Sequence, residues 1–217
     1  MLKGDDFLKI TVFGATGETG KKITEQALEM GYEVVAFARN PSKLNVSNEH
    51  LTVVQGQLSD VGLVESAVKG SSAVLSALGP RGGSKDKPLT QGMQNIIVAM
   101  KKQNVRRLII TSTLSAKDTK DKPNFKTKAM VNLVKTTMHA AYEDIVNVAE
   151  TVRASDLDWT IVRLAILNNK PKSGKVKAGY VGSGEVATQI SRADIADFML
   201  KQITEMKYLH EAPAISN

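Results

Sequence analysis

Three glycines spaced three residues apart follow a short apolar segment near the start of the chain, and together they could hold a dinucleotide. The segment Ile10–Phe13 favours a strand, and Gly14, Gly17 and Gly20 lead into a helical pattern. Glycine lets the chain turn sharply, admits a phosphate close to the backbone and allows tight packing of helix on strand. Unpaired N–H groups at the start of a helix attract an anion. The pattern therefore predicts a pyrophosphate site in this turn.

The second predicted strand, Val34–Ala38, ends at Arg39. In folds that bind nicotinamide dinucleotides, an acidic residue at this position accepts hydrogen bonds from the ribose hydroxyls. A guanidinium cannot accept them, but it pairs well with a 2′-phosphate. The sequence therefore favours NADP(H) over NAD(H), with Lys43 as a second candidate cation. The alternative is that Arg39 and Lys43 are ordinary solvated loop cations.

Composition limits the classes of protein to which the chain can belong. With 217 residues, 42% of them hydrophobic, the chain suits a single domain, residues 1–217. The absence of cysteine excludes disulfides, thiolate catalysis and cysteine-ligated zinc, and three scattered histidines predict no metal site. Because no apolar run suits a signal peptide or a membrane span, we expect a cytoplasmic protein without a membrane partner.

The chain carries a net charge of +7, with lysines clustered in residues 117–128 and 170–177. We interpret both clusters as solvated loops whose field would attract a phosphate-bearing cofactor. No motif typical of nucleic-acid binding accompanies them, so a nucleic-acid partner is not expected. The sequence leaves open whether residues 117–128 form a lid, and whether the protein is a monomer or a dimer.

Strands alternate with helical patterns along most of the chain, which predicts an α/β fold of the Rossmann type. We expect a doubly wound parallel sheet covered by helices on both faces. A small C-terminal cap containing Val176–Tyr180 and a last helix from Ser191 to about Thr204 would complete the domain. The predicted strands are Ile10–Phe13, Val34–Ala38, Leu51–Gln55, Ala73–Leu78, Arg107–Ser112 and Trp159–Leu164.

Ligands of such sheets lie beyond the carboxyl ends of the strands. The segments that follow all six predicted strands lie there, and the glycine turn is the first of them. We therefore expect these segments to line one crevice. The residues at or after the ends of the other five strands are Arg39, Gln57, Leu58, Leu78, Gly79, Ser112, Thr113, Leu164 and Ala165.

Several of these motifs together resemble a known family. They are the turn Gly14–Gly20, the strand that ends in Arg39, Leu78 with Gly79, Thr160–Arg163 and Ser191–Ala196. The chain resembles the atypical short-chain dehydrogenase/reductases of the NAD(P)H-binding type, in particular the biliverdin-IXβ reductase/flavin reductase-like proteins and the putative NADH-flavin reductases. The resemblance runs over nearly the whole chain.

The resemblance implies a single-domain Rossmann fold that binds NADP(H) and reduces a planar acceptor. The acceptor would be a small molecule such as a quinone or a flavin (FMN, FAD or riboflavin), stacked on the nicotinamide. By position, the family places Thr113 near the nicotinamide as the candidate catalytic residue and Arg39 at the 2′-phosphate. The other implied cofactor-binding residues are Gly14, Thr16, Gly17, Glu18, Thr19, Gly20, Gln57, Leu58, Leu78, Gly79, Pro80, Arg81, Ser112 and Leu164.

Two positions depart from the family pattern. Gln57 replaces an aspartate after the third-strand glycine, although its amide could still bind adenine. Ile166 replaces a histidine of the mammalian flavin reductase, so any role of that histidine is lost.

The chain also lacks the Tyr-x-x-x-Lys pair with which ordinary short-chain dehydrogenases protonate an alkoxide. Tyr142 and Tyr180 are followed four residues later by Val146 and Gly184. Flavins and quinones delocalise the incoming charge, so they need less help from the protein. We therefore expect an NAD(P)H-dependent reductase of a planar acceptor. A redox-sensing NADP(H)-binding regulator, similar to the nitrogen-metabolite repressor proteins, is the alternative.

Three further pairs or single side chains allow two interpretations each, whereas His139 allows one. Ser112 and Thr113 could donate hydrogen bonds to a ligand or merely end the fifth strand. Arg163 could face a ligand or pair with an acidic neighbour, and Tyr180 could cover the acceptor or belong to the core. His139 is interpreted as structural.

Overall fold

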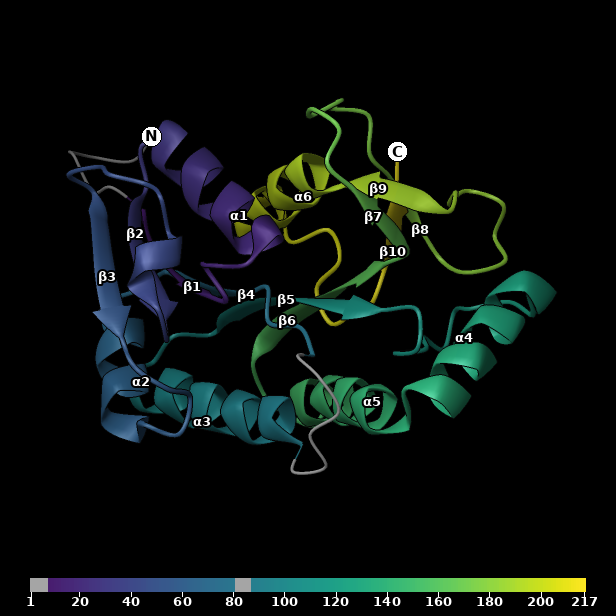
Figure 1. Ribbon diagram of the computed structural model, residues 1–217, viewed down its shortest axis with the longest axis horizontal. Helices are drawn as coiled ribbons and strands as arrows, with labels where there is room; N and C mark the ends of the chain where they lie inside the picture. Colours follow the sequence, from purple (N-terminus) through teal and green to yellow (C-terminus); the bar gives the residue numbers. More distant parts are fainter. Residues whose placement is uncertain (1–7, 81–86) are drawn as a thin grey trace.

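A central sheet of eight strands organises the computed structural model, which describes residues 8–80 and 87–217 (Figure 1). Its strand order is β3-β2-β1-β4-β5-β6-β10-β8, and only the last pair, β10 with β8, is antiparallel. The strands of this sheet are β1 (Lys9–Phe13), β2 (Glu33–Ala38), β3 (Leu51–Gln55), β4 (Ala73–Ser76), β5 (Arg107–Thr113), β6 (Asp158–Leu164), β8 (Lys177–Gly179) and β10 (Ala214–Ser216).

Helices cover both faces of the sheet. One face packs against α1 and α6, and the other packs against α2, α3 and α5, with α4 beside α5 (Figure 1). The helices are α1 (Glu18–Glu29), α2 (Val61–Val68), α3 (Pro88–Lys102), α4 (Phe125–Thr137), α5 (His139–Arg153) and α6 (Arg192–Glu205).

The strand order reverses between β1 and β4. The chain runs outward from β1 to β3 and then returns to β4, on the other side of β1. A crevice forms where neighbouring connections leave in opposite directions, beyond the carboxyl ends of these two strands. The predicted doubly wound α/β fold is therefore confirmed.

Burial on both faces explains why the central strands are almost continuously apolar. In β5, Leu108 and Ile110 join the core under α3 and α5, whereas Ile109 joins the core under α1 and α6. All four residues of β4 are buried. Strands covered on both sides lack polar alternation, so the apolar runs in the sequence were a reliable signal.

The six predicted parallel strands are confirmed, with ends displaced by at most two residues. Helical patterns in the sequence run from Met130 to His139 and from Glu143 to Ser155, and the two helices after β5 begin earlier than these patterns predict, at Phe125 and His139. Asn124 explains the first start, because its side-chain oxygen accepts a hydrogen bond from the Thr127 N–H at 2.9 Å.

The C-terminal region forms a small cap, within which β7 (Ile166–Asn168) and β9 (Gln189–Ser191) pair as a separate two-stranded sheet. The predicted cap segment, Val176–Tyr180, contains β8, and this strand extends the main sheet through β10 instead of belonging to the cap alone. Strands of three residues carry too little periodicity to be found in the sequence.

The start of α6 agrees with the predicted capping signal. The Ser191 hydroxyl accepts a hydrogen bond from the Asp194 N–H at 3.0 Å and donates one to its carboxylate at 2.7 Å. The same carboxylate accepts from the Ser173 and Gly174 N–H groups, which holds the cap against the helix. Burial alone would raise the pKa of Asp194, but these hydrogen bonds outweigh it and lower the pKa.

Gly20 lies where α1 presses against the turn that precedes it. A Cβ at this position would lie 2.1 Å from the Gly14 carbonyl oxygen, whereas a Cβ at Gly62 in α2 would meet nothing within 4 Å. We expect Gly20→Ala to lower the free energy of unfolding by about 1–3 kcal/mol or more. The control Gly62→Ala should raise it by up to about 1 kcal/mol. Urea unfolding measures both, and a Gly20→Ala variant as stable as the parent would contradict this packing.

Candidate functional site

The turn between β1 and α1 approaches the end of β4 closely. Gly14 has a φ of +80°, and a Cβ there would lie 2.9 Å from the carbonyl carbon and oxygen of Ala77. The Gly17 N–H donates to the Gly14 carbonyl at 2.9 Å and closes the turn. Any side chain at Gly14 would collide with backbone, so glycine is required for this geometry.

The first turn of α1 offers free hydrogen-bond donors. Gly17 caps the helix in an extended conformation without a side-chain hydrogen bond. Within residues 8–80 and 87–217, the N–H groups of Glu18, Thr19 and Gly20 have no partner, whereas the Lys21 N–H donates to the Gly17 carbonyl at 2.8 Å. Three unpaired donors at the positive end of a helix dipole fit a pyrophosphate.

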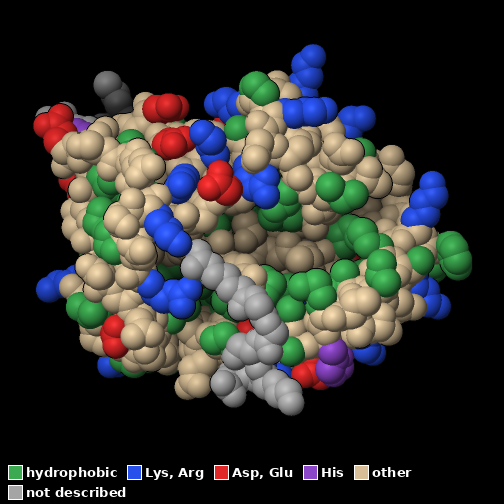
Figure 2. Space-filling model, in the orientation of Figure 1, with side chains coloured by type: hydrophobic (Ala, Val, Ile, Leu, Met, Phe, Trp, Pro, Cys, Tyr) green, Lys and Arg blue, Asp and Glu red, His purple; other side chains and the backbone are tan. Residues whose placement is uncertain are grey.

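Arg39 follows β2 at the same edge of the sheet and is exposed. Neither Arg39 nor Lys43, in the short helix Pro41–Lys43, forms an ion pair with any carboxylate in the described part of the chain. Lys and Arg side chains gather between the central hollow of this face and the β3 edge (Figure 2). Two cations without an ion-pair partner, at the end of the crevice beside β2, have the charge that would suit a phosphate group.

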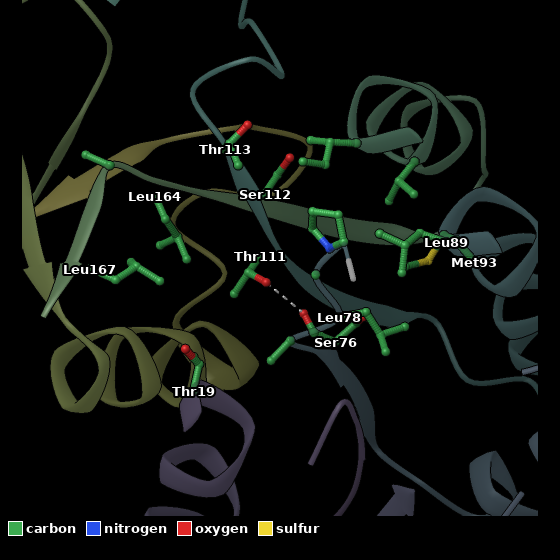
Figure 3. A pocket seen from close by; sticks show the side chains of 16 residues that line it. Thr19, Ser76, Leu78, Leu89, Met93, Thr111, Ser112, Thr113, Leu164 and Leu167 are labelled. Atoms are coloured by element: carbon green, nitrogen blue, oxygen red, sulfur yellow. Dashed lines mark hydrogen bonds between the residues drawn. The ribbon is translucent and has the colours of Figure 1, made fainter. Parts of the chain in front are cut away.

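A cleft of about 230 Å³ lies beyond the carboxyl ends of β4, β5 and β6 (Figure 3). Its lining residues are Thr19, Ser76, Ala77, Leu78, Gly79, Pro80, Leu89, Met93, Thr111, Ser112, Thr113, Ile145, Val148, Leu164, Ala165 and Leu167.

The cleft is built from both sides of the sheet. Figure 3 shows Leu89 and Met93 of α3 on one side of the carboxyl edge, and Thr19, Leu164 and Leu167 on the other. Its polar side chains are all hydroxyls, and no titratable side chain lines it within the described residues. Such a lining suits an uncharged planar ring and offers no acid or base that could carry out proton transfer.

The hydroxyls that follow one another at the end of β5 differ in their partners. Thr111 donates to the Ser76 carbonyl at 3.4 Å, and the Thr113 oxygen accepts from the Ser115 N–H at 3.2 Å. The Ser112 hydroxyl oxygen is buried without any hydrogen-bond partner in the described structure. A buried unsatisfied hydroxyl is costly, so a ligand group that bonded to it would gain affinity.

The predicted site residues fall into three groups. Thr19, Leu78, Gly79, Pro80, Ser112, Thr113 and Leu164 line the cleft. The others in the glycine turn, Gly14, Thr16, Gly17, Glu18 and Gly20, lie beside it, and Arg39, Gln57 and Leu58 lie at the ends of β2 and β3.

Two of the predicted positions, Leu58 and Arg81, are not among the described residues that line the cleft. The Leu58 side chain packs against Gly92 of α3, so its position favours a structural role, and its contact with a cofactor stays a prediction. Arg81 lies outside the described residues.

Sequence reasoning missed the helical wall of the cleft. Leu89, Met93, Ile145 and Val148 are not among the predicted site residues, and Leu167 belongs to β7, a strand that the sequence did not predict. Their three- and four-residue spacing is the same for a core face and for a cleft wall, so the sequence held no signal that separates the two.

Two further candidates lie away from the cleft. Arg163 is fully buried and pairs with both oxygens of Asp121, at 2.6 and 2.7 Å, so the interpretation of an acidic partner is confirmed. Burial alone would raise the pKa of Asp121, but the hydrogen bonds from Arg163 and from backbone N–H groups lower it. His139 is exposed, with its Nε2 3.3 Å from Glu143.

Tyr180 does not line the cleft either. Its hydroxyl bonds to Glu211 and accepts from Lys120 Nζ at 3.3 Å. Burial and the bond to Glu211 raise the pKa of Tyr180 to about 12. The phenol therefore keeps its proton, in contrast to the activated tyrosine of ordinary short-chain dehydrogenases.

The lysine-rich segment after β5 is attached to the C-terminal region. Asp118 accepts a hydrogen bond from the Ala212 N–H at 3.0 Å, and the Lys122 N–H donates to the Val181 carbonyl at 2.8 Å.

The described residues contain no group of three or more acidic or histidine side chains that could hold a metal ion. None of the described helices has an apolar stretch that could span a membrane.

A family model described as NAD(P)H-binding matches residues 14–206. An uncharacterised chloroplastic protein of Arabidopsis thaliana is 30% identical over 181 residues, which cover 77% of this chain but only 62% of that protein. The chain thus spans less than two thirds of this relative.

Solved structures share the fold. A short-chain dehydrogenase/reductase from Veillonella parvula in complex with NADP superposes with a TM-score of 0.82 at 20% identity, covering 97% of this chain and 95% of that one. An anaerobilin reductase from Escherichia coli O157:H7 superposes with a TM-score of 0.76 at 19% identity, covering 95% and 96%.

The unsatisfied Ser112 hydroxyl leads to a stability prediction. Ser112→Ala removes a buried oxygen without a partner, so the free energy of unfolding should be unchanged or higher. The control Thr11→Val removes a buried hydroxyl that bonds to the Ala67 carbonyl and to Ser71 at 2.6 and 2.8 Å, and should cost about 1–3 kcal/mol. Denaturant unfolding compares the two variants. A clear loss of stability in Ser112→Ala would show that this hydroxyl has a partner.

Proposed function

The chain belongs to the NAD(P)H-binding family, and from this premise we propose that it is a reductase which transfers hydride from NADPH to a planar acceptor such as a flavin or a quinone. The observation that carries the proposal is the cleft, whose described lining consists of hydroxyls and apolar groups and lies directly beside the free donors of α1. The cytoplasm is the proposed compartment. Both the NADP-bound neighbour and the anaerobilin reductase have this fold, which favours reductase chemistry.

The cofactor would lie across the carboxyl edge of the sheet. The unpaired N–H groups of Glu18, Thr19 and Gly20 would hold the pyrophosphate, and Arg39 the 2′-phosphate. Gln57 would lie near the adenine. The nicotinamide, which supplies the hydride, would occupy the cleft between β4 and β5, in contact with Leu78, Gly79 and Pro80.

The acceptor would stack against the nicotinamide on the apolar lining. Because the Thr113 oxygen already accepts a hydrogen bond from the Ser115 N–H, its own hydrogen is free to donate to the acceptor. We propose Thr113 as the catalytic residue because its hydroxyl would donate a hydrogen bond to the acceptor. No group in the described lining can deliver a proton at neutral pH, which favours acceptors that delocalise the added charge and take a proton from water. Holding the two rings in contact would supply much of the rate.

A second candidate function is a redox-sensing NADP(H)-binding regulator without catalysis. The absence of titratable side chains from the described lining of the cleft and the raised pKa of Tyr180 are compatible with it. Tight NADP⁺ binding without turnover of any acceptor would favour this candidate over the reductase.

The reductase proposal predicts a pattern of acceptors. Purified protein with NADPH should reduce FMN, riboflavin or a simple quinone, and an aliphatic ketone should serve as a poor substrate because it needs a protein acid. Loss of the nicotinamide absorbance measures both. Turnover of the ketone but not of the planar acceptors would contradict the proposed substrate class, and no turnover at all would contradict the enzyme.

The 2′-phosphate proposal predicts the effect of reversing a charge. Arg39→Asp should weaken NADPH binding by at least about tenfold and narrow its advantage over NADH, since an ion pair is lost and an anion faces the phosphate. Lys69→Asp is the matched control, because Lys69 is exposed at the opposite, amino edge of the sheet. Fluorescence titration with both coenzymes gives the affinities. Equal effects of the two changes would show that Arg39 is not at the phosphate.

A further inference from the structure

Helix α4 has the fewest buried residues of the six α-helices in the described structure. Of its thirteen residues only Val131 is buried, yet it carries large apolar side chains. Phe125 is 85% exposed and Leu133 is 63% exposed, and Met138, which follows the helix, is 55% exposed. The helix lies at one end of the molecule, beside α5 (Figure 1). Exposed apolar surface of this kind indicates an interaction site.

The exposed apolar residues of α4 form a stripe. Phe125, Ala129 and Leu133 follow one another at intervals of four residues and therefore share one side of the helix. Val131 lies on the opposite side, where it anchors α4 to the body. We call the residues Phe125, Ala129 and Leu133 the outer stripe.

The charged residues of α4 itself are all basic. Lys126 lies on one side of the stripe and Lys128 and Lys135 lie on the other, and all three are exposed. From Lys122 to Tyr142 the sequence contains no aspartate or glutamate. The two acidic residues just before this segment, Asp118 and Asp121, bond to the C-terminal region and to Arg163, so they do not neutralise it.

This charge pattern discriminates between possible occupants. A second copy docking through the same stripe would bring lysines against lysines, which is unfavourable. An anionic surface complements the basic flanks, and an apolar layer beneath its charges would receive Phe125 and Leu133. A helix that projects at one end of the molecule matches a flat surface of this kind (Figure 1).

We propose that α4 docks on the surface of an anionic lipid bilayer. The outer stripe inserts at the level of the headgroups, and the flanking lysines extend to lipid phosphates. The sequence predicted no membrane partner, because that expectation rested on the absence of a spanning segment. An interfacial helix needs none. The proposal stands independently of the reductase activity.

Cosedimentation of the full chain with lipid vesicles tests the proposal. We expect binding to vesicles of phosphatidylcholine mixed with phosphatidylglycerol, little binding to phosphatidylcholine alone, and weakening by added salt. The double variant Phe125→Ser and Leu133→Ser should bind at least about tenfold more weakly. Val98→Ser is the matched control, because Val98 is an exposed apolar residue of α3, 47% accessible, and this variant should bind like the parent.

Three outcomes overturn the proposal. The first is no binding to either vesicle, and the second is equal binding by the double variant and the parent. The third is a dimer, seen in sedimentation equilibrium, that the double variant abolishes, since the stripe would then join two copies. Circular dichroism of both variants establishes that they are folded, which is expected because the substituted side chains are exposed.

Discussion

The contact between the first turn of α1 and the end of β1 is the constraint on which the rest of the site depends. Gly20 lies so close to the Gly14 carbonyl that no side chain fits between them, and Gly14 in turn touches the backbone of Ala77 after β4. These contacts fix the direction of α1. As a result, its unpaired N–H groups lie at the reversal of strand order, beside the cleft.

The two ends of the crevice have opposite character. The end near β2 and β3 is open and carries unpaired cations, whereas the end beyond β4, β5 and β6 is apolar with a few hydroxyls. A reduced nicotinamide dinucleotide has the same asymmetry, because it carries phosphates at one end and a flat, uncharged nicotinamide ring at the other. Under the proposed function, the crevice would select its cofactor by charge and its acceptor by shape, because the described part of the cleft offers no proton donor other than hydroxyls and water.

The sequence was sufficient for the features that repeat or that use special residues. The apolar strands and the glycine turn could be found from it, because burial on both faces and backbone geometry restrict which residues fit, whereas the role of Arg39 stays a prediction. The cleft wall formed by Met93 and Val148 could not, since helix periodicity does not distinguish a wall from a core. Short strands such as β10 also escaped, because tertiary pairing with β6 and not local preference stabilises them.

Calorimetric titration of the unmodified protein with NADP⁺ and with NAD⁺ measures whether the glycine turn and Arg39 bind a dinucleotide. We expect NADP⁺ to bind with a dissociation constant in the micromolar range and NAD⁺ to bind more weakly. Failure of both coenzymes to bind at millimolar concentration would contradict the assignment of the glycine turn as a pyrophosphate site, and equal affinity would contradict the role of Arg39.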